Sequence, residues 1–173
     1  MKKVTKKLSL LEMEQVMTVL TEEEQSMLIG GDSNSLFQAM AMVGQLYNNP
    51  MVAADYRRDY EAYMPNQSAD TIYYDGAASF MDTKFNVFKQ SWNTIVSGDG
   101  QIFTFNQSNI LFVNYDPTGL NLKDSIVDNI VILTEYNSIT GMCKYIDPAD
   151  RQTKTTERNK LSNDFVYRVD YKS

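Results

Sequence analysis

The chain has 173 residues, of which 43% are hydrophobic and 12% aromatic, so it has enough apolar material for the core of one domain. Its net charge of −6 argues against nucleic-acid binding, and no apolar run long enough to span a membrane is present. One cysteine excludes an internal disulfide framework. The absence of histidine removes the commonest metal ligand and general base, so we expect no cofactor.

The first 31 residues carry a pattern that is typical of a processing signal. Four lysines lie within the first seven residues, and an acidic run at 21–24 precedes Met27-Leu28-Ile29-Gly30-Gly31. Met17, Leu20 and Leu28 are spaced to form one apolar stripe on a helix. A Gly-Gly pair has no side chains, so a peptidase could close tightly around the backbone there.

This segment resembles the double-glycine leader of bacteriocin-type precursors, which a peptidase-containing ABC transporter removes during export. The resemblance covers residues 8–31, although Gln25 stands where the family usually has Leu or Met. It implies a leader (1–31) cleaved after Gly30-Gly31, a cytoplasmic precursor and a secreted mature domain (32–173). It also implies that the leader docks on the exporter through Met17, Leu20, Glu24 and Leu28. The alternative is an ordinary amphipathic helix that ends at a glycine C-cap.

The residues after Gly31 predict helices. Asp32-Ser33-Asn34-Ser35 can cap a helix over 36–47, and Asn48-Asn49-Pro50 predicts a break with Pro50 in the first turn of the next helix. That helix, 51–64, would carry Val52, Tyr56, Tyr60 and Tyr63 on one side. A third helix is expected over 69–81.

From Phe85 onward the apolar pattern predicts strands instead. They are expected at 85–89, 102–105, 110–115, 130–136, 142–146 and 165–171, with a hairpin at 137–141 and a turn at 147–150. Lys154–Lys160 is interpreted as a solvated mixed-charge loop. Cys143 lies mid-strand and is expected to be a buried structural thiol. Helices followed by an antiparallel sheet predict an α+β fold.

Several segments resemble a papain-like cysteine peptidase of the bacteriocin-processing type. Asn129–Tyr136, the hairpin after it and Tyr145–Pro148 are similar to the second half of that fold, in which a His opens the first strand and an Asp-Pro turn supplies the Asp that orients it. Asn163–Tyr171 resembles the closing strand, and Ser35 heads a helix as the family's nucleophilic Cys does. The resemblance spans 33–171 and implies a papain-like fold.

The residues at the family's catalytic positions have been replaced. Ser35 stands at the position of the Cys and Asn129 at that of the His, whereas Asp147 matches the orienting Asp. The family's chemistry needs a thiolate stabilised by an imidazolium and by a helix N-terminus, together with oxyanion donors. A Ser hydroxyl without a base is a poor nucleophile, and Asn cannot accept its proton. We therefore expect a degenerate site, although Ser35 could alternatively be only a helix N-cap.

The expected function is that of an exported pseudo-peptidase that binds a peptide or protein partner without cutting it, as an inhibitor, decoy or bacteriocin-like antagonist. Two alternatives remain open at this point. One is an active hydrolase related to cysteine peptidases, and the other is a secreted structural protein. Turnover that disappears on Ser35→Ala would favour the first alternative.

Overall fold

The computed structural model describes residues 34–95, 102–104, 110–119, 125–127 and 129–172. Three helices come first in this part of the chain and all of its strands follow, so the predicted α+β class is confirmed. In chain order the elements are α3 (Asn34–Leu46), α4 (Ala53–Tyr63), α5 (Tyr74–Lys84), β1 (Phe85–Lys89), α6 (Trp92–Ile95), β2 (Ile102–Thr104), β3 (Ile110–Tyr115), β4 (Asn129–Asn137), β5 (Met142–Ile146), β6 (Thr153–Glu157), the 3₁₀ helix η1 (Arg158–Lys160) and β7 (Leu161–Tyr171).

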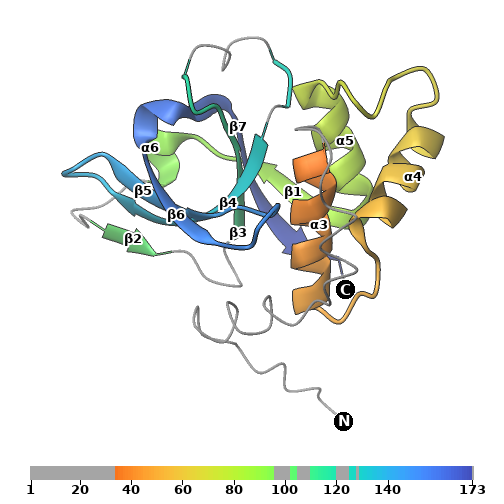
Figure 1. The fold of residues 1–173 in the computed structure, drawn as a ribbon, viewed down its shortest axis with the longest axis horizontal. Coiled ribbons are helices and arrows are strands. Elements are labelled where there is room, and N and C mark those ends of the chain that lie inside the picture. The colour runs from red at the N-terminus through yellow and green to blue at the C-terminus, as the bar shows by residue number, and fades with distance from the viewer. Residues whose placement is uncertain (1–33, 96–101, 105–109, 120–124, 128, 173) are drawn as a thin grey trace.

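The strands form one antiparallel sheet in the order β1-β7-β3-β4-β5-β6 (Figure 1). β3 lies near its centre, between β7 and β4, and β2 pairs with the end of β4 beyond the reach of β3. The hairpin between β4 and β5 turns at residues 137–141, where Gly141 takes a positive φ of 71°. β1 and β6 form the two edges of the six-strand path.

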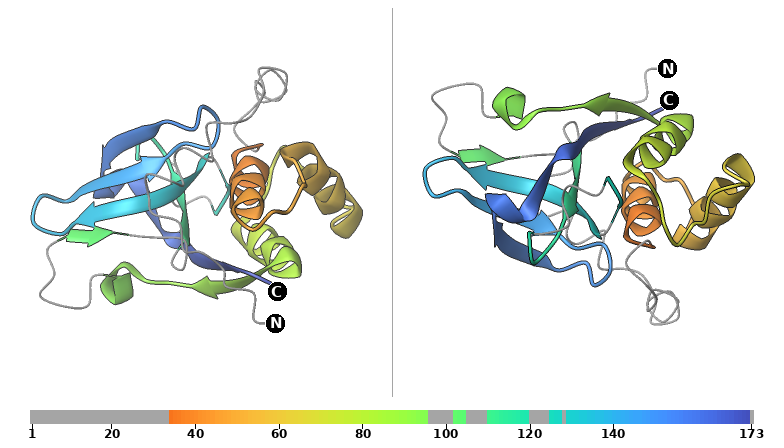
Figure 2. Two further views of the ribbon diagram at one scale, coloured as in Figure 1. Left: turned by 90° about the horizontal axis from the view of Figure 1, so that it is seen from below. Right: turned by 90° about the horizontal axis from the view of Figure 1, so that it is seen from above.

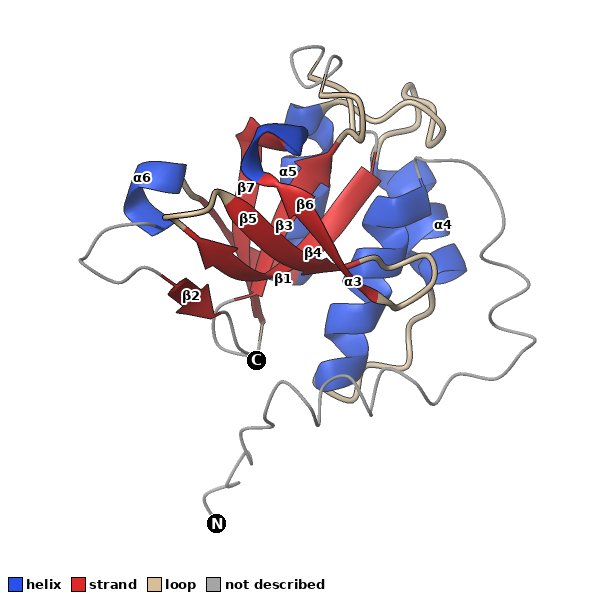
Figure 3. Ribbon diagram, turned by 60° about the vertical axis from the view of Figure 1, so that its left-hand side comes forward, coloured by secondary structure: helices blue, strands red, loops and turns tan. Residues whose placement is uncertain are grey.

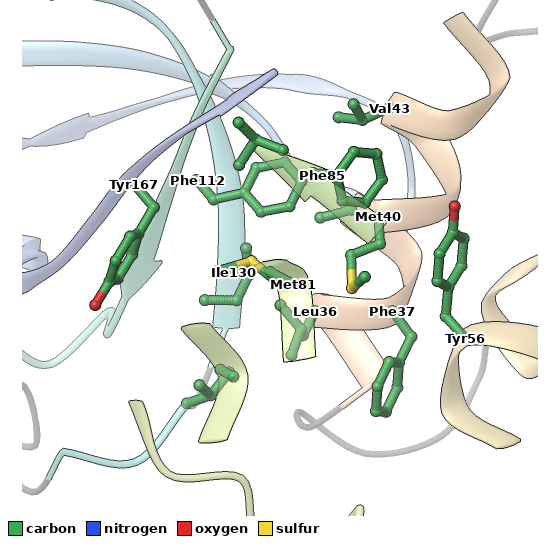
Figure 4. Close-up of a cluster of buried hydrophobic side chains, with 14 of the residues drawn as sticks. Leu36, Phe37, Met40, Val43, Tyr56, Met81, Phe85, Phe112, Ile130 and Tyr167 are labelled. Carbon is green, nitrogen blue, oxygen red and sulfur yellow. The ribbon is translucent and has the colours of Figure 1, made fainter. Parts of the chain in front are cut away.

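Side chains on the two faces of the sheet belong to two separate cores. The first core is formed by one face of the sheet together with α3, α4 and α5. Phe112 of β3 and Ile130 of β4 belong to it (Figure 4), as do Ile110 and Ile132 of the same strands. The second core lies on the opposite face and includes the alternate residues of the same strands, with Trp92 of α6. The two-residue repeat of a strand explains this division, because successive side chains point to opposite faces.

Helix α3 is the central helix of the first core. All of its residues except Asn34 and Gln45 are buried, because it packs between the sheet on one side and α4 on the other (Figure 2). A helix that is hydrophobic all round suits such a position. It ends where Asn48 adopts a positive φ of 60°, a conformation that Asn tolerates at a helix C-terminus.

Two predicted helix boundaries were wrong. Helix α4 begins at Ala53, with the Asp55 carboxylate accepting a hydrogen bond from the Val52 amide, so Pro50 precedes the helix rather than opening it. Of the four residues predicted to share one side of this helix, Tyr56 and Tyr60 are fully buried, whereas Val52 and Tyr63 are exposed. Helix α5 begins at Tyr74 instead of residue 69.

The late start of α5 has a non-local cause. Tyr73 forms a β-bridge with Ile126, and the Val127 amide donates to the Ile72 carbonyl at 2.8 Å. These contacts with the segment 125–127 hold the chain before Tyr74 in an extended conformation. The segment lies far from Tyr74 in the sequence. Helical periodicity alone could not indicate these contacts.

The predicted solvated loop at Lys154–Lys160 is also wrong. Its first part belongs to strand β6, which pairs with β5 through the register Cys143↔Thr156, and its second part is η1. The strand is rich in Thr, which favours β-structure, but its charged residues are also typical of a solvated loop. Helix α6 was not predicted.

Candidate functional site

The candidate site lies where the first turn of α3 meets the beginning of β4. Ser35 is 7% exposed, and its hydroxyl oxygen accepts a hydrogen bond of 2.7 Å from the Ile130 amide, 95 residues further along the chain. Asn34 already belongs to the helix, so Ser35 lies inside α3 and is not its N-cap. The alternative interpretation of Ser35 as only a cap is therefore wrong. The hydrogen bond to the Ser35 hydroxyl links helix α3 to strand β4 of the sheet.

Asn129 belongs to the same junction. It is the first residue of β4, directly before Ile130, and it pairs with Tyr115 of β3 in the sheet register. The structure thus brings together the helix turn that carries Ser35 and the strand end that carries Asn129. An amide N–H stabilises an oxygen but cannot take a proton from it, and the chain has no histidine.

Asp147 lies in the turn after β5, and its carboxylate is engaged within that turn. One oxygen accepts a hydrogen bond of 2.9 Å from the Ala149 amide, and the other contacts Lys154 Nζ at 2.7 Å. Lys154 also pairs with Asp150 at 2.6 Å. Partial burial lowers the pKa of Lys154, but its hydrogen bonds to Asp147 and Asp150 outweigh that effect and raise it above the usual value. These contacts fix the β5–β6 turn, and an orienting role for Asp147 stays a prediction.

A buried polar network lies beside this junction and was not predicted from the sequence. Asn114 is fully buried and pairs with Ile130 in the sheet register, and its side-chain amide donates to the Tyr74 hydroxyl at 2.9 Å and to the Ile126 carbonyl at 3.4 Å. The Tyr74 hydroxyl in turn donates to Ser162 Oγ at 3.4 Å. The only sequence signal is a polar residue inside the apolar run of β3.

Cys143 is 1% exposed within the second core, so the prediction of a buried thiol in a strand is confirmed. Burial raises the pKa of this thiol to about 12, although the nearby Arg158 lowers it slightly. A buried thiol of this kind is inert, because the thiolate is the reactive form.

We expect native Cys143 to resist iodoacetamide at about pH 8 and to react once the protein is unfolded in urea. Its pKa of about 12 in the folded state lies above the ordinary value of 9.0, so the unfolded chain releases this proton first. The free energy of unfolding should therefore fall as the pH rises from about 9 to 12, and it should fall less in Cys143→Ala. Equal labelling rates for folded and unfolded protein would contradict this expectation.

Comparisons with known proteins leave the family open. No protein-family model matches the chain, and no curated protein matches it. The resemblances to double-glycine leaders and to papain-like peptidases therefore stay predictions.

The predicted leader lies outside the described residues. This applies both to the processing site at Gly30 and Gly31 and to the docking positions Met17, Leu20, Glu24 and Leu28. Within the described ranges, no helix is long and apolar enough to cross a membrane, and no group of His, Cys, Asp or Glu side chains could hold a metal ion.

Proposed function

We propose that this chain is an exported precursor whose mature domain acts by binding a peptide or protein partner, through a papain-like fold that has lost its catalytic pair. A peptidase-containing ABC transporter would cleave it after Gly31, leaving residues 32–173 as the secreted domain. The observation that carries the non-catalytic part of this proposal is the 2.7 Å hydrogen bond from the Ile130 amide to the Ser35 hydroxyl oxygen.

Three features support the papain-like part. A buried helix with Ser35 in its first turn packs against an antiparallel sheet. The strand that begins at Asn129 lies next to that turn. The following antiparallel strand ends directly before Asp147. The resemblance in the sequence implies this same order of positions.

The chemistry of the junction favours binding over hydrolysis. Ser needs a neighbouring base to become a nucleophile. The resemblance puts Asn129 at the position of the base, and its neutral amide cannot act as a base at neutral pH. Ser35 is also largely buried, so its hydroxyl serves to hold α3 against β4.

Restoring the two replaced residues tests the proposed ancestry. We expect Ser35→Cys combined with Asn129→His to give a thiol that reacts with iodoacetamide at pH 6 at least about tenfold faster than the thiol of Ser35→Cys alone. The reason is that a neighbouring imidazolium lowers the pKa of a cysteine below its ordinary range. Both variants should carry Cys143→Ala, which leaves position 35 as the only thiol in the chain.

The single variant Ser35→Cys is the matched control, because it has the same thiol at the same helix position without the base. Equal rates in the single and double variants would show that position 129 does not reach the nucleophile position. That result would remove the support for a papain-like site. It would leave the leader, which is tested separately, unaffected.

A further inference from the structure

Arg158 of η1 is held in one orientation by three contacts. Its guanidinium carbon lies 3.7 Å from the centre of the Trp92 ring, one terminal nitrogen donates to the Leu161 carbonyl at 2.7 Å, and the other donates to Asn163 Oδ1. A guanidinium fixed in this way loses little further conformational freedom when it binds a ligand. Within the described part of the chain, these hydrogen bonds use two of its five N–H groups.

Among the residues that the structure describes, no acidic side chain pairs with Arg158. Arg57, Arg58 and Arg168 each pair with a carboxylate at 2.6 to 3.3 Å, whereas Arg158 forms no ion pair with any residue that the structure describes. Of the groups close enough to act on its charge, Cys143 is a thiol and Tyr136 a phenol, and neither is a carboxylate. Burial lowers the pKa of Arg158 to about 10, so it remains charged at pH 7.

The aromatic ring that lies against Arg158 is itself held in place. Trp92 is 9% exposed, and its ring packs edge-to-face on the half-buried Tyr136 at 5.4 Å. The Trp92 indole N–H donates to the Ser162 carbonyl at 2.9 Å, so the aromatic platform under the guanidinium is itself fixed. Trp, Tyr and Arg are the residue types that most often dominate binding energy at protein interfaces.

We propose that Arg158, seated on Trp92, binds a carboxylate presented by a protein partner. Arg matches a carboxylate with two parallel hydrogen bonds, and a small planar monoanion costs less to desolvate beside an aromatic ring than a dianion such as phosphate. The site lies at the end of the sheet that carries α6, on the face opposite α3 (Figure 3). It is therefore independent of Ser35 and of the proposed ancestry.

Trp92 offers a direct measurement, because it is the only tryptophan in the chain. In a ¹H–¹⁵N spectrum of the full chain its indole N–H gives one cross-peak. We expect this peak to shift in a saturable manner when acetate replaces chloride at constant ionic strength. Two further probes separate the source of the carboxylate. The α-amide of N-acetylglutamate, whose only acid is the side-chain carboxylate, mimics an acidic side chain, and N-acetylglycine mimics a C-terminus.

Variants of two arginines complete the test. Arg158→Gln should abolish the saturable shift, and Arg158→Lys should weaken it, because Lys keeps the charge but loses the planar fork. Arg168→Gln is the matched control and should leave the shift intact, because Arg168 also lies over a ring, that of Phe88 at 4.4 Å, but is already paired with Asp170. A shift that does not saturate, that is stronger with phosphate, or that survives Arg158→Gln would overturn the proposal.

Discussion

Replacing Phe112 by Ala is expected to lower the free energy of unfolding by about 3–5 kcal/mol, the range for large aromatic truncations in a core. Phe112 is fully buried on β3, in the middle of the sheet, and its ring lies between the sheet and α3 (Figure 4). Removing the ring loses its burial and leaves a cavity that the surrounding strands cannot close, because β3 is bonded on both sides. Urea unfolding of the variant and of the parent chain measures the difference.

Phe88→Ala is the matched control for this prediction. Phe88 lies on the edge strand β1 and is 44% exposed, and the guanidinium carbon of Arg168 lies 4.4 Å from the centre of its ring. We expect this variant to lose about 1 kcal/mol or less, the scale of an exposed cation–π contact. Similar losses in the two variants would contradict the assignment of the first core to the space between α3 and the sheet.

The second large effect is expected at the buried network of Asn114, Tyr74 and Ser162. Asn114→Leu should cost about 1–3 kcal/mol, because it removes the donor to the Tyr74 hydroxyl and to the Ile126 carbonyl inside the fold. The exposed Asn86 of β1 provides a comparison of the same residue type, and Asn86→Leu should change stability by no more than about 0.5 kcal/mol.

A double-mutant cycle with Tyr74→Phe distinguishes loss of the hydrogen bond between Asn114 and Tyr74 from poorer packing of the substituted side chains. Each single variant leaves a polar group of the partner without one of its hydrogen bonds, whereas the double variant removes both groups together. The double variant should therefore lose less stability than the sum of the two singles, with a difference of at least about 0.5 kcal/mol. Strict additivity would show that Asn114 and Tyr74 do not act as a pair.

The predictable part of the fold consists of elements whose pattern is local. The strands at Ile110–Tyr115 and Met142–Ile146 were predicted with the bounds that the structure has, because each is a short β-prone segment bounded by turn residues. Strand β6 was missed because an edge strand needs little apolar surface, so its Thr and charged residues resemble a loop. The start of α5 depends on Ile126, a partner that local periodicity does not identify.

The same distinction between local patterns and long-range contacts applies to the candidate site. No pattern of spacing identifies the contact between Ser35 and the start of β4, because the two residues lie so far apart in the chain. The papain-like resemblance, which relates the two positions, stays a prediction. The contact between Asn114 and Tyr74 and the stacking of Arg158 on Trp92 could not be predicted at all. A lone polar residue in a strand, or a lone Arg after one, does not identify its partner.

The central claim is that this chain is a leader-bearing precursor whose domain from Asp32 onward works outside the cell that makes it. The intact mass of the protein in the culture supernatant of its host tests this claim most directly. We expect a species that begins at Asp32, with the mass of residues 32–173. A full-length chain that is found only inside the cells would contradict the claim, and residues 1–31 would then be part of an intracellular protein.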